Sequence, residues 1–446
     1  MRLDHNSAPL RLARFAAGRR AAAGLIVVAL LAGALLAAAC GRPPAGNGPV
    51  TLVFKHAKIL GPTDPVADLL RKFEASHPGV RVKSESLPWT TDEQHQYYVV
   101  NMEGGGTPAF DVLMLDVIWV PEFARAGWLL DLTDHVPRAE LAAHFRSAVE
   151  AATFRGRVWA LPWIMNVGLL YYRKDLLDKY GLRPPETYEE LVGQVHRIRV
   201  GERDAGLDGF LWQGKQYEGL VVNALEALWA NGTSLLDGDG RLFPDPARAE
   251  EALADLRMLI ATGVSPPWVT AADEELTRRA FGNGRAVFLR NWPYVLDLLE
   301  QPESPVRGRI GIAALPRHAH GIGGAGSTGG AHLGVHRQTR HPELAAALVR
   351  FLTSEEAQRT MAGGVALNPT RTALYRDPAL LPSHPGFPEI YRLTLAGRPR
   401  PVTPYYLMLS STLQPELSAV IVGIKSPRDM VRQSRARVAH MLRDLK

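Results

Sequence analysis

Two glycine-rich segments have the spacing of nucleotide-binding loops, and each departs from the pattern at a decisive position. Residues 209–216 (GFLWQGKQ) match a phosphate-binding loop, except that Gln216 stands where Ser or Thr would hold magnesium. Gly321, Gly323 and Gly326 satisfy G-x-G-x-x-G, but residues 331–335 read as a strand, whereas a dinucleotide loop leads into a helix. We therefore expect turns here and no nucleotide cofactor.

Histidines offer no convincing metal or catalytic pattern. His332 and His336 have the spacing of two ligands on one face of a helix, but on the expected strand they would not meet at one metal ion. The motifs G-x-S-x-G and H-E-x-x-H do not occur. We therefore expect no metal, no cofactor and no catalytic residues, so that the protein is not an enzyme.

The aromatic residues instead suit a site that holds a polar ligand without changing it. Tryptophans are scattered over the chain after residue 50, many of them beside turns or polar residues. Sugars present apolar C–H faces and rings of hydroxyls, so their sites combine aromatic surfaces with acids, amides and arginines. Most of these tryptophans should pack in the core, and their spacing does not indicate which of them line a pocket.

The first forty residues have the order of a bacterial lipoprotein signal peptide. Four arginines lie between residues 11 and 20, an apolar run covers residues 25–39, and Ala37, Ala38 and Ala39 lead into Cys40. We expect cleavage after residue 39 and a lipid on Cys40, which would hold the exported protein at a membrane surface without a spanning helix. Ordinary cleavage after Ala39 and an uncleaved N-terminal anchor remain alternatives.

The remaining composition indicates an exported globular body. The chain has 51 basic and 45 acidic residues, or +6; the leader holds five arginines and one acid, so the mature part has 46 against 44, or +2. No dense basic stripe remains for nucleic acid. Cys40 is the single cysteine, so no intrachain disulfide can form and stability must come from a large core. Residues 40–49 should form the lipidated end and a flexible tether.

Strands and helices alternate along the rest of the chain, which indicates an α/β fold. Residues 110–115 form a nearly continuous apolar run, typical of a buried parallel strand. Further strands are expected at 50–54 and 80–82. Amphipathic spacing predicts helices at 66–77, 191–200, 219–231, 247–262, 342–352 and 427–445.

Several longer segments carry a family resemblance over essentially the whole mature chain. The segments are residues 113–119 (LMLDVIW), 160–162 (ALP), 168–177 (GLLYYRKDLL), 209–219 (GFLWQGKQYEG), 290–294 (RNWPY), 368–371 (NPTR) and 399–406 (PRPVTPYY). In these segments the chain resembles the extracellular solute-binding proteins of ABC sugar importers, and most closely the maltose/trehalose-binding lipoproteins. The resemblance implies a sugar ligand, ABC permease subunits as partners, and a monomer in the periplasm or at the cell surface.

The resemblance also implies two α/β lobes joined by hinge crossings, the type II periplasmic-binding-protein fold, with the ligand cleft between the lobes. Lobe 1 is expected at residues 50–166 plus 311–352, and lobe 2 at residues 167–310 plus 353–446. Hinge closure would let the ligand favour the closed state through the contacts it makes with both surfaces.

The resemblance assigns ligand contacts at matching positions. Asp116 should accept hydrogen bonds from hydroxyls, Trp292 should stack on a ring face, and Arg371 should donate to oxygens. Thr90 stands at a polar contact, and Gly330 would offer backbone groups. Structural alternatives are a helix cap for Asp116 and an ion pair for Arg371.

Other candidate contacts depart from the maltose/trehalose pattern. Ile164 and Asn166 replace an aromatic residue and an acid, Ala331 replaces a tryptophan, and His95 replaces an arginine; Trp163 completes the candidate set. The cleft should therefore have fewer acids and less aromatic surface, which favours a sugar other than simple maltose. A glycoside hydrolase would need two opposed carboxylates, so the loss of acids argues against one.

Two alternative functions remain. Lys55, His56 and Lys58 follow the first expected strand and raise the possibility of an anionic or phosphorylated ligand, such as a glycerophosphodiester. A solvated surface loop explains these three residues equally well. A surface carbohydrate sensor could use the same cleft without an importer.

Overall fold

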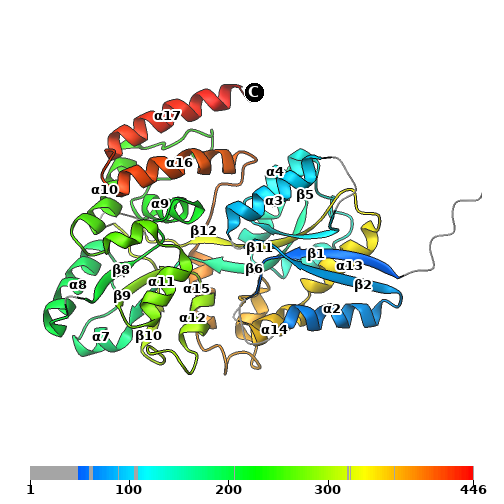
Figure 1. Ribbon diagram of the computed structural model, residues 1–446, viewed down its shortest axis with the longest axis horizontal. Coiled ribbons are helices and arrows are strands. Elements are labelled where there is room, and N and C mark those ends of the chain that lie inside the picture. Colours follow the sequence, from blue (N-terminus) through cyan, green and yellow to red (C-terminus); the bar gives the residue numbers. More distant parts are fainter. Residues whose placement is uncertain are drawn as a thin grey trace, which may run out of the picture. The chain divides into compact units, whose positions relative to one another are not determined.

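The structure is a computed structural model that describes residues 49–59, 64–88, 90–104, 109–204, 206–318, 321, 323–365 and 367–444. The signal peptide, Cys40 and most of the expected tether lie outside these residues. Strands and helices alternate along the described chain, as the sequence predicts (Figure 1).

The first lobe is built around a six-stranded mixed sheet with the order β12-β11-β3-β1-β2, in which β6 also pairs with β11. Strands β1 and β3 are parallel, and β11 runs antiparallel to both β3 and β6. The apolar run predicted as a buried strand is β3, which begins at Val112. The strands are β1 (Val50–His56), β2 (Val80–Ser86), β3 (Val112–Asp116), β6 (Ala160–Val167), β11 (Ser327–Val335) and β12 (Arg398–Pro399).

The second lobe contains a four-stranded sheet with the order β10-β7-β9-β8. Strand β9 is buried at every residue, and it pairs with β7 and β8 on its two sides. The strands are β7 (Leu169–Arg173), β8 (Asp208–Leu211), β9 (Ala286–Asn291) and β10 (Ile310–Ala313). A short hairpin, β4 (Thr153–Phe154) and β5 (Arg157–Val158), forms a separate sheet.

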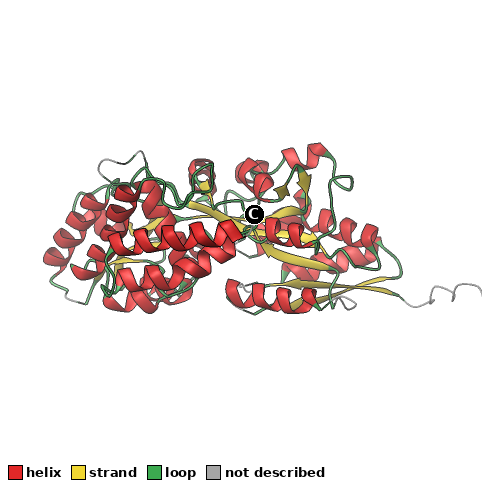
Figure 2. Cartoon of the chain, turned by 90° about the horizontal axis from the view of Figure 1, so that it is seen from above, coloured by secondary structure: helices red, strands yellow, loops and turns green. Residues whose placement is uncertain are grey.

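Helices flank the strands of the first-lobe sheet (Figures 1 and 2), and α13 packs against β11, β3 and β6. Val66, Leu69, Leu70 and Phe73 give α2 one buried face at helical spacing. Helix α14 packs against α2. The helices are α2 (Pro65–Ser76), α3 (Thr91–Glu103), α4 (Val120–Ala126), α5 (Arg138–Ala142), α6 (Arg146–Ala151), α13 (Pro342–Leu352) and α14 (Glu355–Gly364).

The second lobe is richer in helix. Helix α9 is buried at every residue and packs against α10 and α16, which explains why its sequence is apolar on all sides. The helices are α7 (Lys174–Lys179), α8 (Tyr188–Glu202), α9 (Glu218–Ala230), α10 (Pro246–Ala261), α11 (Glu274–Gly282), α12 (Tyr294–Leu299), α15 (Phe387–Ala396), α16 (Tyr406–Ile421) and α17 (Pro427–Asp444). Two 3-10 helices, η1 (Pro267–Ala271) and η2 (Thr372–Arg376), complete the set of described helices.

Each lobe has its own hydrophobic core, and the cores divide the chain differently from the sequence expectation. Strand β10 pairs with β7 in the second lobe, although residues 311–352 were expected in the first. Helix α14 packs on the first lobe, although residues from 353 onwards were expected in the second. Sequence patterns mark elements, but they do not show which of two neighbouring cores an element joins.

The lobes are joined by segments that lie side by side. The amide of Gly168, between β6 and β7, donates to the carbonyl of Ser327 at 3.0 Å, and the amide of Arg398 donates to Gly326 at 3.0 Å. We call the segments 167–169, 326–328 and 397–399 the crossings. They place the ends of β6, β11 and β12 between the two cores.

Candidate ligand-binding site

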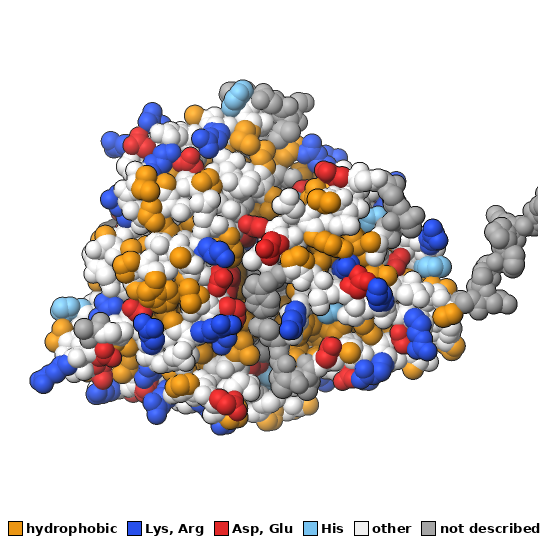
Figure 3. Space-filling view, in the orientation of Figure 1, with side chains coloured by type: hydrophobic (Ala, Val, Ile, Leu, Met, Phe, Trp, Pro, Cys, Tyr) orange, Lys and Arg blue, Asp and Glu red, His pale blue; other side chains and the backbone are white. Residues whose placement is uncertain are grey.

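A cavity of about 310 Å³ lies between the lobes. On the face shown in Figure 3, acidic side chains gather along the hollow between the two halves of the chain. The described residues that line it from the first lobe and the crossings are Ala57, Lys58, Ile59, Thr90, Thr91, Gln94, Met114, Asp116, Ile164, Asn166, Gly329, Gly330, Ala331, Leu367 and Arg400. Those from the second lobe are Lys215, Tyr217, Glu218, Gly219, Val222, Asp273, Glu274, Trp292, Tyr294 and Leu298.

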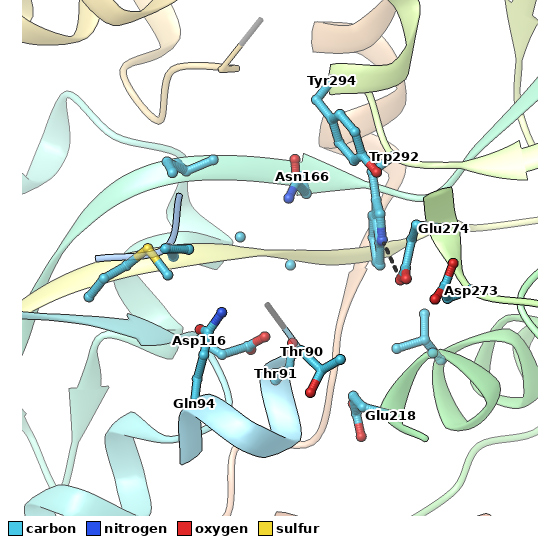
Figure 4. Close-up of a pocket in the computed structure, with 18 of the residues that line it drawn as sticks. Thr90, Thr91, Gln94, Asp116, Asn166, Glu218, Asp273, Glu274, Trp292 and Tyr294 are labelled. Atoms are coloured by element: carbon cyan, nitrogen blue, oxygen red, sulfur yellow. Dashed lines mark hydrogen bonds between the residues drawn. The ribbon is translucent and has the colours of Figure 1, made fainter. Parts of the chain in front are cut away.

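The register of three neighbouring strands forms the first-lobe wall. Ala331 of β11 lies opposite Asp116 of β3 on one side and Ile164 of β6 on the other. Asn166 lies two residues further along β6, and strand alternation puts it on the same face as Ile164. Figure 4 shows Asn166 and Asp116 on opposite sides of the cavity centre. Asp116, Ile164 and Ala331 thus come together on this wall, although they are far apart in the sequence.

Gly330 is required by the backbone of this wall. Its φ is +118°, and a Cβ atom would lie 2.0 Å from the carbonyl oxygen of Ile164. Because both the conformation and the space exclude a side chain, Gly330 brings bare backbone to the cavity.

Thr90 and Gln94 line the cavity from the start of α3. The hydroxyl of Thr90 accepts the Glu93 amide and the Glu93 carboxylate accepts the Thr90 amide, both at 3.3 Å, which forms a capping box. Thr90 therefore both begins the helix and faces the cavity (Figure 4).

Aromatic side chains form part of the second-lobe wall. The indole nitrogen of Trp292 donates to Glu274 at 3.3 Å (Figure 4). The hydroxyl of Tyr217 donates to the other Glu274 oxygen at 2.5 Å. The hydroxyl of Tyr294 donates to Glu275 at 3.1 Å. Each ring is thus held by its polar end, which leaves apolar surface toward the cavity.

A buried ion network closes one side of the cavity. Arg400 donates to Asp116 at 2.6 Å and to Glu218 at 2.9 Å, and only 4% of its side chain is exposed. Tyr406 and Ser410 donate to the same Glu218 carboxylate. Burial acts to lower the pKa of Arg400, but the two carboxylates outweigh it and raise that pKa. Arg400 therefore stays charged and links the lobes.

Two lysines also line the cavity. Lys215 lies 3.7 Å from Asp273, and Lys58 is exposed on the loop after β1. The other basic residues near Lys58 are engaged elsewhere: Lys55 pairs with Glu85, and His56 shares hydrogen bonds with Ser84 and the Ala57 carbonyl. Burial also lowers the pKa of His56. The expected basic triad therefore brings only Lys58 to the cavity.

Three residues expected as ligand contacts lie outside the cavity lining. The guanidinium of Arg371 donates to the carbonyl of Thr353 at 2.8 Å. His95 is 3.1 Å from Glu122 and packs against Trp119. Trp163 is 2% exposed and belongs to the first-lobe core. Residues 368–371 support the outer side of β6, where Asn368 accepts the Met165 amide at 2.9 Å.

Sequence reasoning missed several lining residues that carry charge. Glu218, Lys215 and Arg400 stand inside segments 209–219 and 399–406, so the motifs contained them without indicating that they face a ligand. Asp273 and Glu274 open α11, where the Asp273 side chain accepts the Leu276 amide. An N-capping acid gives no sign in the sequence that it also borders a cavity.

The carboxylates of the cavity accept hydrogen bonds from neighbouring side chains. The Asp116 and Glu218 carboxylates accept from Arg400, and Glu274 accepts from two aromatic side chains. Within the described residues, no three His, Cys, Asp or Glu side chains are grouped to hold a metal ion. The same part of the chain contains no helix long and apolar enough to span a bilayer.

Comparison with known proteins gives a consistent family. A family model described as bacterial extracellular solute-binding protein matches residues 61–359. A probable ABC transporter-binding protein of Deinococcus radiodurans is 37% identical over 335 residues, covering 74% of this chain and 78% of the relative. The multiple sugar-binding protein of Streptococcus mutans is 23% identical over 344 residues, with coverage of 75% and 79%.

A solved structure has a fold similar to that of this chain. The maltose-bound MalE3 protein of T. maritima superposes with a TM-score of 0.81 and is 36% identical, covering 88% of this chain and 100% of that chain. The two-lobed α/β architecture predicted from the sequence is therefore confirmed. The role of such binding proteins is to hold a solute and not to convert it.

Proposed function

Because this chain belongs to the family of bacterial extracellular solute-binding proteins, we propose that it captures a sugar or sugar derivative between its lobes. It then delivers the sugar to the membrane-spanning permease of an ABC importer. The observation that carries the proposal is the composition of the cavity. Tyr217, Trp292 and Tyr294 give it aromatic surface beside the polar groups of Asn166 and Arg400.

This composition matches the chemistry of a sugar. The C–H face of a pyranose stacks on an indole or phenol ring, while its hydroxyls both donate and accept hydrogen bonds. Carboxylates and the Asn166 amide oxygen accept, and Arg400 and the lysines donate, so the cavity offers partners of both kinds. The similar T. maritima protein holds maltose, which supports the sugar class.

We propose that the preferred sugar is not simple maltose. Ile164, Asn166 and Ala331 line the first-lobe wall with one amide and two aliphatic side chains, at positions where the maltose/trehalose pattern carries an acid and aromatic residues. A sugar would therefore find its aromatic surface on the second-lobe side of the described cavity. A ligand that needs aromatic faces on both sides would bind weakly here.

The proposal also covers how the protein is held. Membership of an extracellular family supports export, and the residues before Cys40 have the order of a lipoprotein signal peptide. We propose that a lipid on Cys40 tethers a monomeric protein to the membrane, where the permease lies. This arrangement keeps the loaded protein close to its transporter.

A thermal-shift screen of the purified protein tests the proposal. A ligand that binds only the folded state raises the melting temperature by mass action. The panel should contain maltose, trehalose, longer oligosaccharides, sugar alcohols and sugar phosphates. We expect the largest shift with a neutral sugar other than maltose. A shift confined to phosphorylated compounds would favour the anionic alternative, and no shift with any sugar would contradict the proposal.

A further inference from the structure

A buried arginine, Arg290, packs against the ring of Trp292 and does not line the cavity. The guanidinium carbon of Arg290 lies 4.1 Å from the centroid of the Trp292 ring. The two side chains are two residues apart, and backbone alternation places them on one side of β9 and its continuation. Arg290 thus covers one face of the indole and leaves the other for a ligand.

The polar atoms of Trp292 are held by hydrogen bonds. Its amide donates to the Asn291 side chain at 2.8 Å, and its carbonyl accepts the Tyr171 hydroxyl at 2.7 Å. Its indole nitrogen donates to Glu274. These contacts fix the main chain and one edge of the ring, and Arg290 packs against the face of the ring.

Arg290 is itself held rigidly. It is 1% exposed, and it donates to both oxygens of Glu226, at 2.5 and 2.7 Å, and to Gln213 at 3.2 Å. A planar guanidinium that is held by two parallel bonds to a carboxylate has one orientation. The guanidinium of Arg290 can therefore act as a rigid planar support under the indole, and we call this group the plate.

The anchor of this plate reaches the crossings. Both oxygens of Glu226 accept from Arg290, and one of them, Oε1, also accepts a hydrogen bond from the amide of Ser327 at 2.8 Å. A Cβ atom on Gly168 would lie 2.0 Å from that oxygen, so only glycine leaves room for the carboxylate there. The plate is therefore placed relative to two crossings as well as to its own strand.

We propose that Arg290 is the positioning residue for Trp292: held by Glu226 against the crossings, it sets the angle at which the indole meets a sugar ring. The inference rests on the proposed function, because it concerns the same cavity. The alternative role is purely structural, since a buried ion pair that loses one partner destabilises a fold wherever it lies.

The first test needs no sugar. The emission of Trp292 is obtained by subtracting the spectrum of Trp292→Phe from that of the wild type, and the same subtraction is made in an Arg290→Lys background. Lysine keeps the charge but cannot form the planar, two-bonded plate. We expect the Trp292 component to become more accessible to acrylamide quenching. An unchanged component in a folded Arg290→Lys protein would overturn the proposal.

A matched control is Arg173→Lys. Arg173 also donates to both oxygens of one carboxylate, that of Asp175, at 2.7 and 2.6 Å, and it lies in the second lobe outside the cavity lining. The Arg173→Lys variant should leave the Trp292 component of the emission unchanged. If Arg290→Lys does not fold, as judged by thermal unfolding, Glu226→Gln loosens the same plate and must give the same change in quenching.

The second test is calorimetry with the sugar of the thermal-shift panel that gives the largest shift with the wild type. Arg290→Lys should weaken binding about two- to tenfold in the wild-type background, and should have no further effect in a Trp292→Leu background. Equal weakening in both backgrounds would overturn the positioning role. If no sugar of the panel binds the wild type, the proposed function is contradicted, and the emission measurement still decides on Arg290.

Discussion

Arg400 and Asp116 form an ion pair of 2.6 Å that joins residues 284 positions apart in the sequence. Asp116 ends a strand of the first-lobe sheet, whereas Arg400 follows the last crossing and also contacts Glu218 of the second lobe. Asp116 was expected to accept hydrogen bonds from sugar hydroxyls. The structure shows that it also holds the arginine that supplies a donor to the cavity.

Removing this arginine should damage both stability and binding. Arg400→Met leaves the buried carboxylate of Glu218 and the partly exposed carboxylate of Asp116 without their cation, which should cost about 3–5 kcal/mol of folding free energy. Urea unfolding followed by circular dichroism measures this loss. Arg398→Met is the matched control, because Arg398 is exposed on β12 and should change stability by less than about 0.5 kcal/mol. Equal stability of the two variants would contradict the ion network.

Two buried histidines should make the fold sensitive to acid. Burial lowers the pKa of His332 and of His144 from 6.5 to about 3 in each case. Between about pH 6.5 and pH 3 the unfolded chain therefore binds more protons than the folded one, so the free energy of unfolding should fall as the pH falls. Above about pH 6.5 this contribution is fully present.

The variant His332→Leu isolates this effect. It replaces the buried ring with an apolar side chain, so the drop in melting temperature from pH 7 to pH 5 should be smaller than in the wild type. Thermal unfolding at the two pH values measures the difference. His341→Leu, on the loop before α13, is a control expected to keep the wild-type drop. An identical drop in His332→Leu would show that His332 does not titrate on unfolding.

The lipid anchor can be tested independently of the cavity. Cys40→Ser removes the thiol that would carry the lipid, so the protein should move from the membrane fraction to the soluble fraction. Detergent partitioning and the mass of the N-terminal peptide provide the measurement. Unchanged partitioning of the serine variant would exclude the lipoprotein proposal and favour an uncleaved N-terminal anchor.

Binding should leave the sugar unchanged. Asp116, Glu218 and Glu274 each accept hydrogen bonds from neighbouring side chains, and the family to which the chain belongs binds its solute without converting it. Chromatography after prolonged incubation should return the sugar intact. Product in excess of the amount of protein would identify an enzyme instead.

The sequence predicted several of the strands and helices, and the family resemblance predicted the two-lobed fold. Continuous apolar runs such as residues 112–115 and strongly amphipathic stretches such as residues 342–352 identify their own structure, because their periodicity matches burial on one or both faces. The resemblance then supplied the arrangement of the lobes. It also indicated Asp116, Asn166 and Trp292, all of which line the cavity.

The choice between two arginines was beyond the sequence. Arg371 and Arg400 both stand in proline-containing motifs, and nothing local shows that the first donates to the Thr353 carbonyl outside the cavity lining while the second lines the cavity. The pairing of strands that are distant in the sequence decides which of the two arginines reaches the cavity. Glu226 did offer a signal, because a charged residue within an otherwise apolar helix requires a buried partner, although the sequence could not identify that partner as Arg290.

Calorimetry on Trp292→Ala tests the central claim most directly, which is that a sugar binds between the lobes against this indole. The titrant is the sugar that gives the largest thermal shift with the wild type. Loss of the stacked ring should cost about 1–3 kcal/mol, or one to two decades of affinity. Trp128→Ala, outside the cavity lining, should leave the affinity unchanged. Unaltered affinity of Trp292→Ala would show that the sugar site lies elsewhere.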